Sequence, residues 1–301
     1  MQDDRWPQHC RSLLVASVNS AASAFPTGEN QAPKRIHDAR KTLKQARAIA
    51  RLFVPGLGEP ARVTIAALAT ARRRMAQARD LDVMEQRLKR LDPPEAISEA
   101  VTLAIGRERT AVKRGARGGF GASASRIQLS AIARRLEAWD IGGLRDRDIV
   151  EAVARTYRQA RQRGRRAFKG GDPAALHRLR ARVVDLLYQL AALSPAWPAA
   201  LTAQGDELNE LRDTLGDFND LTVLAAFAST RAGLSPGAMA ALTERLEARQ
   251  KKLRRRARVE FDRLFAEAPE AFADRIAAYL KRPMAKPEIS GDKPAAGRKG
   301  Q

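Results

Sequence analysis

Residues 34–54 read KRIHDARKTLKQARAIARLFV. On a helical wheel at about 100° per residue, six of the cationic side chains fall within an arc of about 120°. Ile36, Leu43, Ile49 and Phe53 lie on the opposite side. The segment is therefore predicted to form an amphipathic helix that buries its apolar face. We call the six cationic residues within the arc the first basic stripe: His37, Arg40, Lys41, Lys44, Arg47 and Arg51.

The first basic stripe contains almost no acidic residue. Like charges at i,i+3 and i,i+4 destabilise an isolated helix by about 0.3 kcal/mol per pair. A solvated helix face normally mixes charges of both signs. We therefore interpret the stripe as an anion-binding surface in preference to an ordinary solvated face.

Helical spacing of apolar residues continues along most of the chain, and good helix formers dominate its composition. We therefore predict an all-α protein. Helix starts are expected where Pro follows a possible capping residue, at Glu59-Pro60, Asp92-Pro93-Pro94, Asp172-Pro173 and Ser235-Pro236. The predicted helices span 5–25, 34–54, 60–91, 94–114, 123–139, 145–169, 173–193, 199–230, 237–266 and 269–281. Residues 115–121 (GARGGFG) are predicted to form a loop.

The sequence also contains a weak internal repeat at an offset of about 140 residues. The aligned identities include His37 with His177, Arg40 with Arg180, Arg72 with Arg212, and Asp80 with Asp220. We predict two similar helical halves, residues 1–140 and 141–282, in one pseudo-symmetric unit. Residues 283–301 are rich in Pro, Gly and Lys and are predicted to form a disordered basic tail.

Composition restricts the possible function classes. The 301 residues contain 55 Lys and Arg against 34 Asp and Glu, a formal net charge of +21, so an anionic partner is expected. One cysteine and three histidines exclude an intramolecular disulfide framework and a Cys/His zinc cluster. No apolar run approaches the roughly 20 residues that span a bilayer. Ser12 to Phe25 is interpreted as an amphipathic helix in preference to a signal segment, so we expect a cytoplasmic protein without membrane association.

Further cations are predicted on two later helices. The second basic stripe consists of Arg245, Arg249, Lys252, Arg256 and Arg263. Additional cations on the helix that opens the second half are Arg155, Arg158, Arg161, Arg165, Arg166 and Lys169. Arg can engage phosphate oxygens bidentately, whereas Lys acts as a point charge. We expect the two stripes to face a shared cavity that accepts an extended anion.

The histidines and the aligned aspartates each allow two interpretations. A lone His on a helix is usually an ordinary hydrogen-bonding residue, but equivalent repeat positions favour a binding role for His37 and His177. Beside a bound polyanion both would be favoured in the charged form, so binding would strengthen as pH falls. Asp80 and Asp220 are expected to form ion pairs that orient neighbouring arginines; a metal site lacks the necessary ligand cluster.

The motif His37-x-x-Arg40-Lys41-x-x-Lys44-x-x-Arg47, with Arg79-Asp80-Leu81-Asp82-Val83 and His177-x-x-Arg180, resembles the CHAD family, the conserved histidine α-helical domain. The resemblance covers roughly residues 5–282. It implies two pseudo-symmetric four-helix bundles and a basic central cavity that binds inorganic polyphosphate at polyphosphate granules. The family's basic positions fall here on His37, Arg40, Lys41, Lys44, Arg47, Arg72, Arg79, His177, Arg180 and Arg212.

The second half departs from the symmetric pattern. Ala181, Val184 and Leu187 stand where the first half has Lys41, Lys44 and Arg47. Either other cations compensate, such as Arg178 and Arg182, or the anion lies closer to the first half. No Glu-x-Glu-x-Lys start of a triphosphate-tunnel domain is found, so the free-standing form is expected.

The leading functional prediction is noncatalytic polyphosphate binding without a cofactor or metal, with polyphosphate-metabolising enzymes as possible partners. The alternative is a nucleic-acid-binding basic helical protein, but only 5% of residues are aromatic, which gives base stacking little support. An enzyme acting on phosphate chains is a third class; it lacks a carboxylate cluster and a nucleophile. The predicted binding residues are His37, Arg40, Lys41, Lys44, Arg47, Arg51, Arg72, Arg79, His177, Arg180, Arg212, Arg245, Arg249, Lys252 and Arg256.

Overall fold

The computed structural model describes residues 5–24, 33–73, 77–116, 122–170 and 172–284, and every regular element in these ranges is a helix. The α-helices are α1 (Arg5–Ala24), α2 (Pro33–Ala50), α3 (Val54–Leu57), α4 (Glu59–Arg73), α5 (Gln77–Leu91), α6 (Glu95–Ala116), α7 (Ala122–Glu137), α8 (Asp146–Lys169), α9 (Pro173–Leu193), α10 (Pro198–Arg231), α11 (Pro236–Leu264) and α12 (Pro269–Leu280). Short 3₁₀ helices cover η1 (Arg51–Phe53) and η2 (Ser194–Ala196). The all-α prediction is confirmed. No described helix is long and apolar enough to cross a membrane.

Most predicted helices match the observed bounds closely, and the exceptions have local causes. The predicted helix 34–54 is regular to Ala50 and then tightens into η1. The short α3 follows, with Pro55 in its first turn and Gly58 at its C-terminal end. Gly58 has a φ of 58°, a conformation that disfavours side chains with a Cβ atom. The predicted helix 60–91 is described as α4 and α5, and residues 74–76 between them lie outside the described residues.

The predicted loop and tail fall largely outside the described part of the chain. Gly115 and Ala116 still belong to α6, so the loop prediction was wrong for these two residues. Residues 117–121 lie outside the described residues, as does the predicted tail from residue 285 onward.

Two of the predicted helix starts show the expected capping contacts. The Asp172 carboxylate accepts a hydrogen bond from the Ala174 N–H at 2.8 Å, and Pro173 is the first residue of α9. The Ser235 hydroxyl accepts from the Ala238 N–H at 3.3 Å at the start of α11. Each cap satisfies a backbone donor that has no partner within its helix. Asp92 instead has a φ of 48° and turns the chain between α5 and α6.

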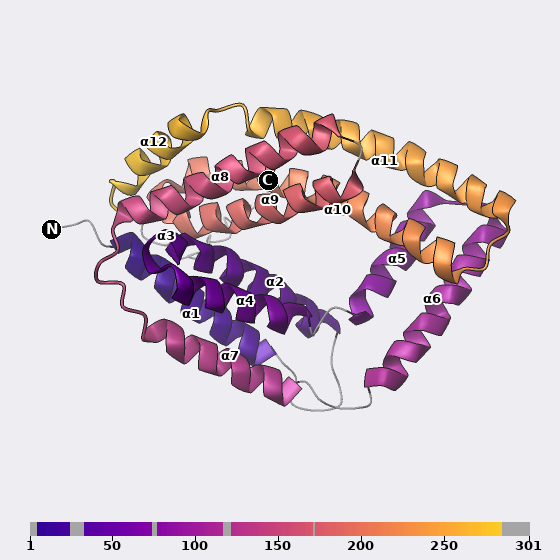
Figure 1. Cartoon of the computed structure of the whole chain (residues 1–301), viewed down its shortest axis with the longest axis horizontal. Coiled ribbons are helices and arrows are strands. Elements are labelled where there is room, and N and C mark those ends of the chain that lie inside the picture. Colours follow the sequence, from indigo (N-terminus) through magenta and orange to yellow (C-terminus); the bar gives the residue numbers. More distant parts are fainter. Residues whose placement is uncertain (1–4, 25–32, 74–76, 117–121, 171, 285–301) are drawn as a thin grey trace, which may run out of the picture.

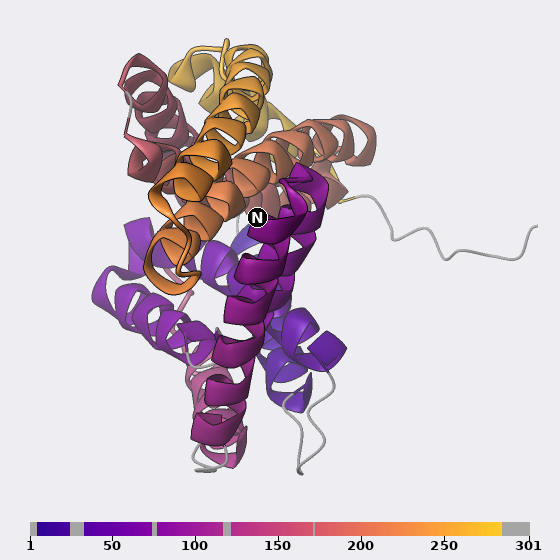
Figure 2. The ribbon, with the colours of Figure 1, turned by 90° about the vertical axis from the view of Figure 1, so that its right-hand side faces the viewer.

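Helix α9 occupies the centre of the molecule (Figure 1). It lies against α2 on one side and against α8 and α10 on the others, while α1 contacts both α2 and α7. Helices α5 and α6 leave the other first-half helices and lie against α10 (Figures 1 and 2). The two halves of the sequence therefore share an extensive interface, in which α2 lies directly beside α9.

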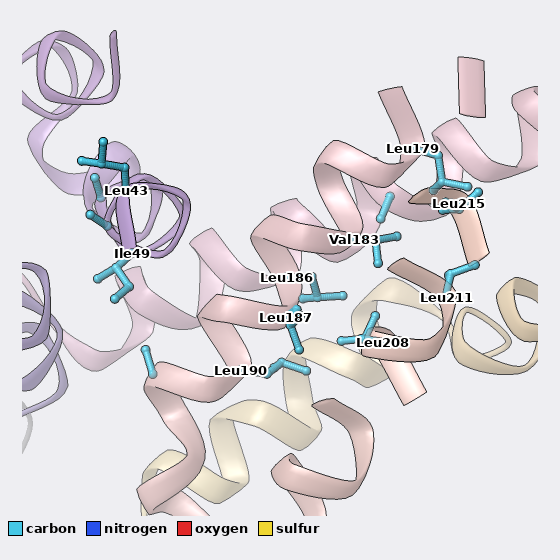
Figure 3. Close-up of a cluster of buried hydrophobic side chains, with 14 of the residues drawn as sticks. Leu43, Ile49, Leu179, Val183, Leu186, Leu187, Leu190, Leu208, Leu211 and Leu215 are labelled. Carbon is cyan, nitrogen blue, oxygen red and sulfur yellow. The ribbon is translucent and has the colours of Figure 1, made fainter. Parts of the chain in front are cut away.

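The core around α9 consists of aliphatic side chains (Figure 3). Leu179, Val183 and Leu190 of α9 point toward Leu208 and Leu215 of α10, and all five are buried. Full burial of such a side chain contributes about 1.5–3 kcal/mol relative to exposure. This packing fixes α9 in rotation and so determines which of its residues face α2.

Four helix starts in the first half of the sequence have counterparts about 140 residues later. Helices α1, α2, α4 and α6 begin 141, 140, 139 and 141 residues before α8, α9, α10 and α11. The Trp6 N–H also donates to the Asp146 carboxylate at 3.1 Å, across 140 residues. These four intervals are close to the offset of the sequence repeat.

Candidate anion-binding site

A pocket of about 310 Å³ opens between α2, α4, α5, α9 and α10. We call it the α2–α9 pocket. Its rim is open to solvent, since His177 and Val223 are exposed. The lining consists of Arg40, Lys44, Arg47, Arg72, Val83, Met84, His177, Arg180, Ala181, Val184, Asn219, Asp220 and Val223.

Helical spacing explains why these side chains meet. Arg40, Lys44 and Arg47 follow one another at i, i+4 and i+7, so they share one face of α2. His177 and Arg180, at i and i+3, likewise share one face of α9. Because α2 and α9 are neighbours, the two basic faces form adjoining walls.

The second-half wall is fixed by hydrogen bonds. His177 Nδ1 lies 2.8 Å from Asn219 Oδ1, and Arg180 Nε donates to the Arg212 carbonyl oxygen at 3.3 Å. Both partners belong to α10. The contacts of α9 with α10 therefore position the cationic side chains as well as the core.

Asp220 is the one carboxylate among the described residues of the pocket lining, and it is paired with a cation. Arg87 of α5 contacts Asp220 at 3.0 Å and also contacts Asp217. Burial raises the pKa of the Asp220 carboxyl, while the charges of Arg87 and Arg180 act in the opposite direction. Among the described lining residues, Arg and Lys side chains therefore outnumber carboxylates.

Arg47 is the lining cation with the clearest electrostatic cost. Burial lowers the pKa of its guanidinium group, the charge of Asp185 opposes this, and Arg51, Arg72 and Arg73 lower the pKa further. A lowered pKa means that the folded protein disfavours the charged form of Arg47 relative to the unfolded chain. A bound anion would reverse that disadvantage.

A buried ion-pair cluster lies behind the pocket, between α2 and α9. The Asp185 side chain is 1% exposed and contacts Arg51 Nε at 3.0 Å and Arg182 Nη2 at 2.6 Å. Burial lowers the pKa of Arg182 to about 10, although Asp185 favours its charged form. Gln189 Nε2 also donates to the Ala48 carbonyl oxygen at 3.0 Å across the same interface.

The structure brings six of the predicted binding residues together in the α2–α9 pocket: Arg40, Lys44, Arg47, Arg72, His177 and Arg180. Lys41 is exposed on α2 outside the lining, Arg51 is paired with Asp185, and Arg212 is paired with Asp213 at 2.8 Å. The side chains of His37, Arg79 and Asp80 lie outside the described residues. Asp220 forms an ion pair as expected, with Arg87 of α5.

The residues of the second basic stripe belong to α11 and are not among the described residues that line the α2–α9 pocket. Arg245 donates to the Asp92 carbonyl oxygen at 2.9 Å, and Arg256 pairs with Glu260 at 2.6 Å. Arg249 borders a separate cavity of about 40 Å³ beside Arg87, and Lys252 is exposed. Neither of these two cavities is lined by described residues of both stripes, and a cavity shared by the two stripes stays a prediction. As polyphosphate contacts, these four residues remain predictions.

The regular elements of the described residues are all helices, and side chains from both halves of the sequence, five of them Arg or Lys, line one pocket. A CHAD domain family model matches residues 21–229, so the chain belongs to the CHAD domain family. The matched segment includes every residue that lines the α2–α9 pocket. No curated protein and no solved structure matches the chain. In the described part of the chain, no group of three or more His, Cys, Asp or Glu could hold a metal ion.

Proposed function

We propose that this protein binds inorganic polyphosphate in the α2–α9 pocket without chemical conversion. The observation that supports the proposal is the composition of the described lining, in which five Arg and Lys residues and His177 accompany one carboxylate, Asp220, that is paired with Arg87. Membership of the CHAD domain family, which is associated with polyphosphate binding, agrees with this charge pattern. Binding of this kind would place the protein at cytoplasmic polyphosphate granules.

Polyphosphate suits the pocket because it carries negative charge on every unit of an extended chain. Arg40, Arg47 and Arg72 offer planar donor pairs for phosphate oxygens, and Lys44 offers a point charge. Replacement of counterions on the polymer by these side chains would release the counterions, which favours binding as it does for nucleic acids. The open rim would let a long chain extend beyond the pocket.

We further propose that the two halves are pseudo-symmetric bundles that contribute unequally to the site. The matched helix intervals support the repeat, and α2 and α9 occupy equivalent places in it. In the lining, α2 supplies three cations, whereas α9 supplies Arg180 and His177 beside the apolar Ala181 and Val184. A bound chain would therefore lie closer to the first half.

Salt should weaken polyphosphate binding steeply. If each phosphate contact contributes about −0.7 to the slope of log Kobs against log[salt], as in single-stranded nucleic acids, the five Arg and Lys residues predict a slope of roughly −3.5. Affinity measured by fluorescence anisotropy at several stated NaCl concentrations gives this slope. A slope near zero would mean that the pocket cations do not contact phosphates.

Competition between polyanions tests the proposed ligand directly. Labelled long-chain polyphosphate bound at fixed salt should be displaced by unlabelled polyphosphate at much lower phosphate concentration than by duplex DNA or RNA. None of the described lining residues is Phe, Tyr or Trp, so unstacked bases would gain little there. Preferential displacement by either nucleic acid would reject polyphosphate in favour of the nucleic-acid alternative.

A further inference from the structure

Three arginines and one carboxylate meet behind the α2–α9 pocket. Arg47 and Arg51 come from α2 and η1, and Arg182 comes from α9. Asp185 acts electrostatically on both Arg47 and Arg182, and it contacts Arg51 directly. The cluster therefore has three positive charges and one buried negative charge.

Asp185 divides these arginines into two groups. Arg51 and Arg182 lie within 3.0 Å of its carboxylate and do not line the pocket. Arg47 lines the pocket, and its Nε atom is buried without a hydrogen-bond partner among the described residues. One arginine thus faces the cavity while the other two are held behind it.

Asp185 holds Arg51 and Arg182 in place by the attraction between opposite charges. Both arginines lie at ion-pair distance from the Asp185 carboxylate, Arg51 at 3.0 Å and Arg182 at 2.6 Å. An asparagine at this position would keep the shape of the side chain and lose the attraction. Charge and shape can therefore be separated by one substitution.

We propose that Asp185 is a positioning residue that keeps Arg51 and Arg182 out of the anion site and leaves Arg47 to contact the ligand. This inference rests on the proposed function, because it assigns which cations of that site bind phosphate. Asp185 supplies one negative charge to the cluster, and a phosphate bound next to Arg47 supplies the second. Arg51, although part of the first basic stripe, then contributes no phosphate contact in the native protein.

The salt dependence of binding separates this role from a merely structural one, because the slope counts phosphate contacts. Arg51→Met should leave the slope unchanged. Asp185→Asn should make the slope steeper by about −0.7 for each arginine released, since Arg51 and Arg182 can then reach the polyanion. Asp185→Asn combined with Arg51→Met should remove the part of this increase that is due to Arg51. The probe is long-chain polyphosphate, titrated at several NaCl concentrations.

Two results would overturn the proposal. One is a shallower slope in Arg51→Met, which would make Arg51 a native phosphate contact; this single variant decides the point even if Asp185→Asn does not fold. The other is an unchanged or shallower slope in folded Asp185→Asn. Thermal denaturation without ligand gives an independent measurement: Asp185→Asn should lower the midpoint, and adding Arg51→Met should restore part of it. Failure of the native protein to bind polyphosphate would reject the proposed function, while the denaturation result would still test the charge pairing.

Discussion

Replacing Lys44 and Arg72 together by glutamate should reduce polyphosphate affinity by at least about 100-fold. Both side chains line the pocket, one from α2 and one from α4. A hydrogen bond to a charged group contributes about 1.5–3 kcal/mol, so loss of two such bonds costs at least about 3 kcal/mol. Since about 1.4 kcal/mol corresponds to a tenfold change, the expected loss is about two orders of magnitude before repulsion from the new carboxylates is added. Titration with long-chain polyphosphate at fixed salt measures it.

These two positions are preferable to Arg40 for charge reversal. Arg40 is only 6% exposed, so Arg40→Glu would place a carboxylate in the interior and endanger the fold. Lys44 and Arg72 are half-buried, and a glutamate there can reach solvent. Circular dichroism should therefore show unchanged helicity for the double variant.

The matched control is Arg134→Glu with Arg135→Glu, at exposed positions in the last turn of α7. Each reversal replaces +1 by −1, so either double variant lowers the formal net charge from +21 to +17. The control should retain affinity within about threefold, because exposed charges far from the ligand are screened by salt. Equal losses in the two variants would mean that net charge alone governs binding, and the α2–α9 pocket would have to be abandoned as the site.

The helices were predictable because their signals are local. Apolar spacing defined α8 and α9 to within a residue, and Asp172-Pro173 marked a capped start that the structure contains. Helix partners were not predictable, since they depend on contacts between distant segments. The sequence alone gave no sign that α5 and α6 would lie against α10 of the other half.

The same distinction between local signals and contacts of distant segments applies to the binding site. The i, i+4, i+7 spacing of Arg40, Lys44 and Arg47 was visible in the sequence, and all three side chains reach the pocket. Asp185 was missed, although an aspartate between Val184 and Leu186 in an apolar segment signals a buried, paired carboxylate. Arg51 shares the helix face of the stripe but forms an ion pair with Asp185 of α9. The pairing was not predictable, because a contact between η1 and α9 cannot be read from the pattern of one helix.

Arg47→Met should stabilise the unliganded protein and weaken polyphosphate binding. Arg47 is positively charged in both the folded and unfolded states at neutral pH. Its lowered pKa therefore represents a destabilisation of the folded state that would disappear only at strongly alkaline pH. Methionine has similar length and no charge, and replacing an incompletely compensated buried ion by an apolar side chain is often neutral or stabilising. We expect the free energy of unfolding to rise by about 1 kcal/mol, or roughly 2 °C in the thermal midpoint.

Polyphosphate affinity should fall while the stability rises. Arg47, the half-buried cation that destabilises the folded protein, is also the one whose charge a bound phosphate would neutralise. Loss of one charge-assisted contact predicts an affinity about tenfold lower or more. Arg135→Met on α7 makes the same charge change at an exposed position and should alter neither stability nor affinity appreciably. If Arg47→Met lowered the midpoint and kept full affinity, Arg47 would serve the packing of α2 against α9 and not the anion. A higher midpoint with weaker binding would show that this fold retains an unfavourable charge because the ligand needs it.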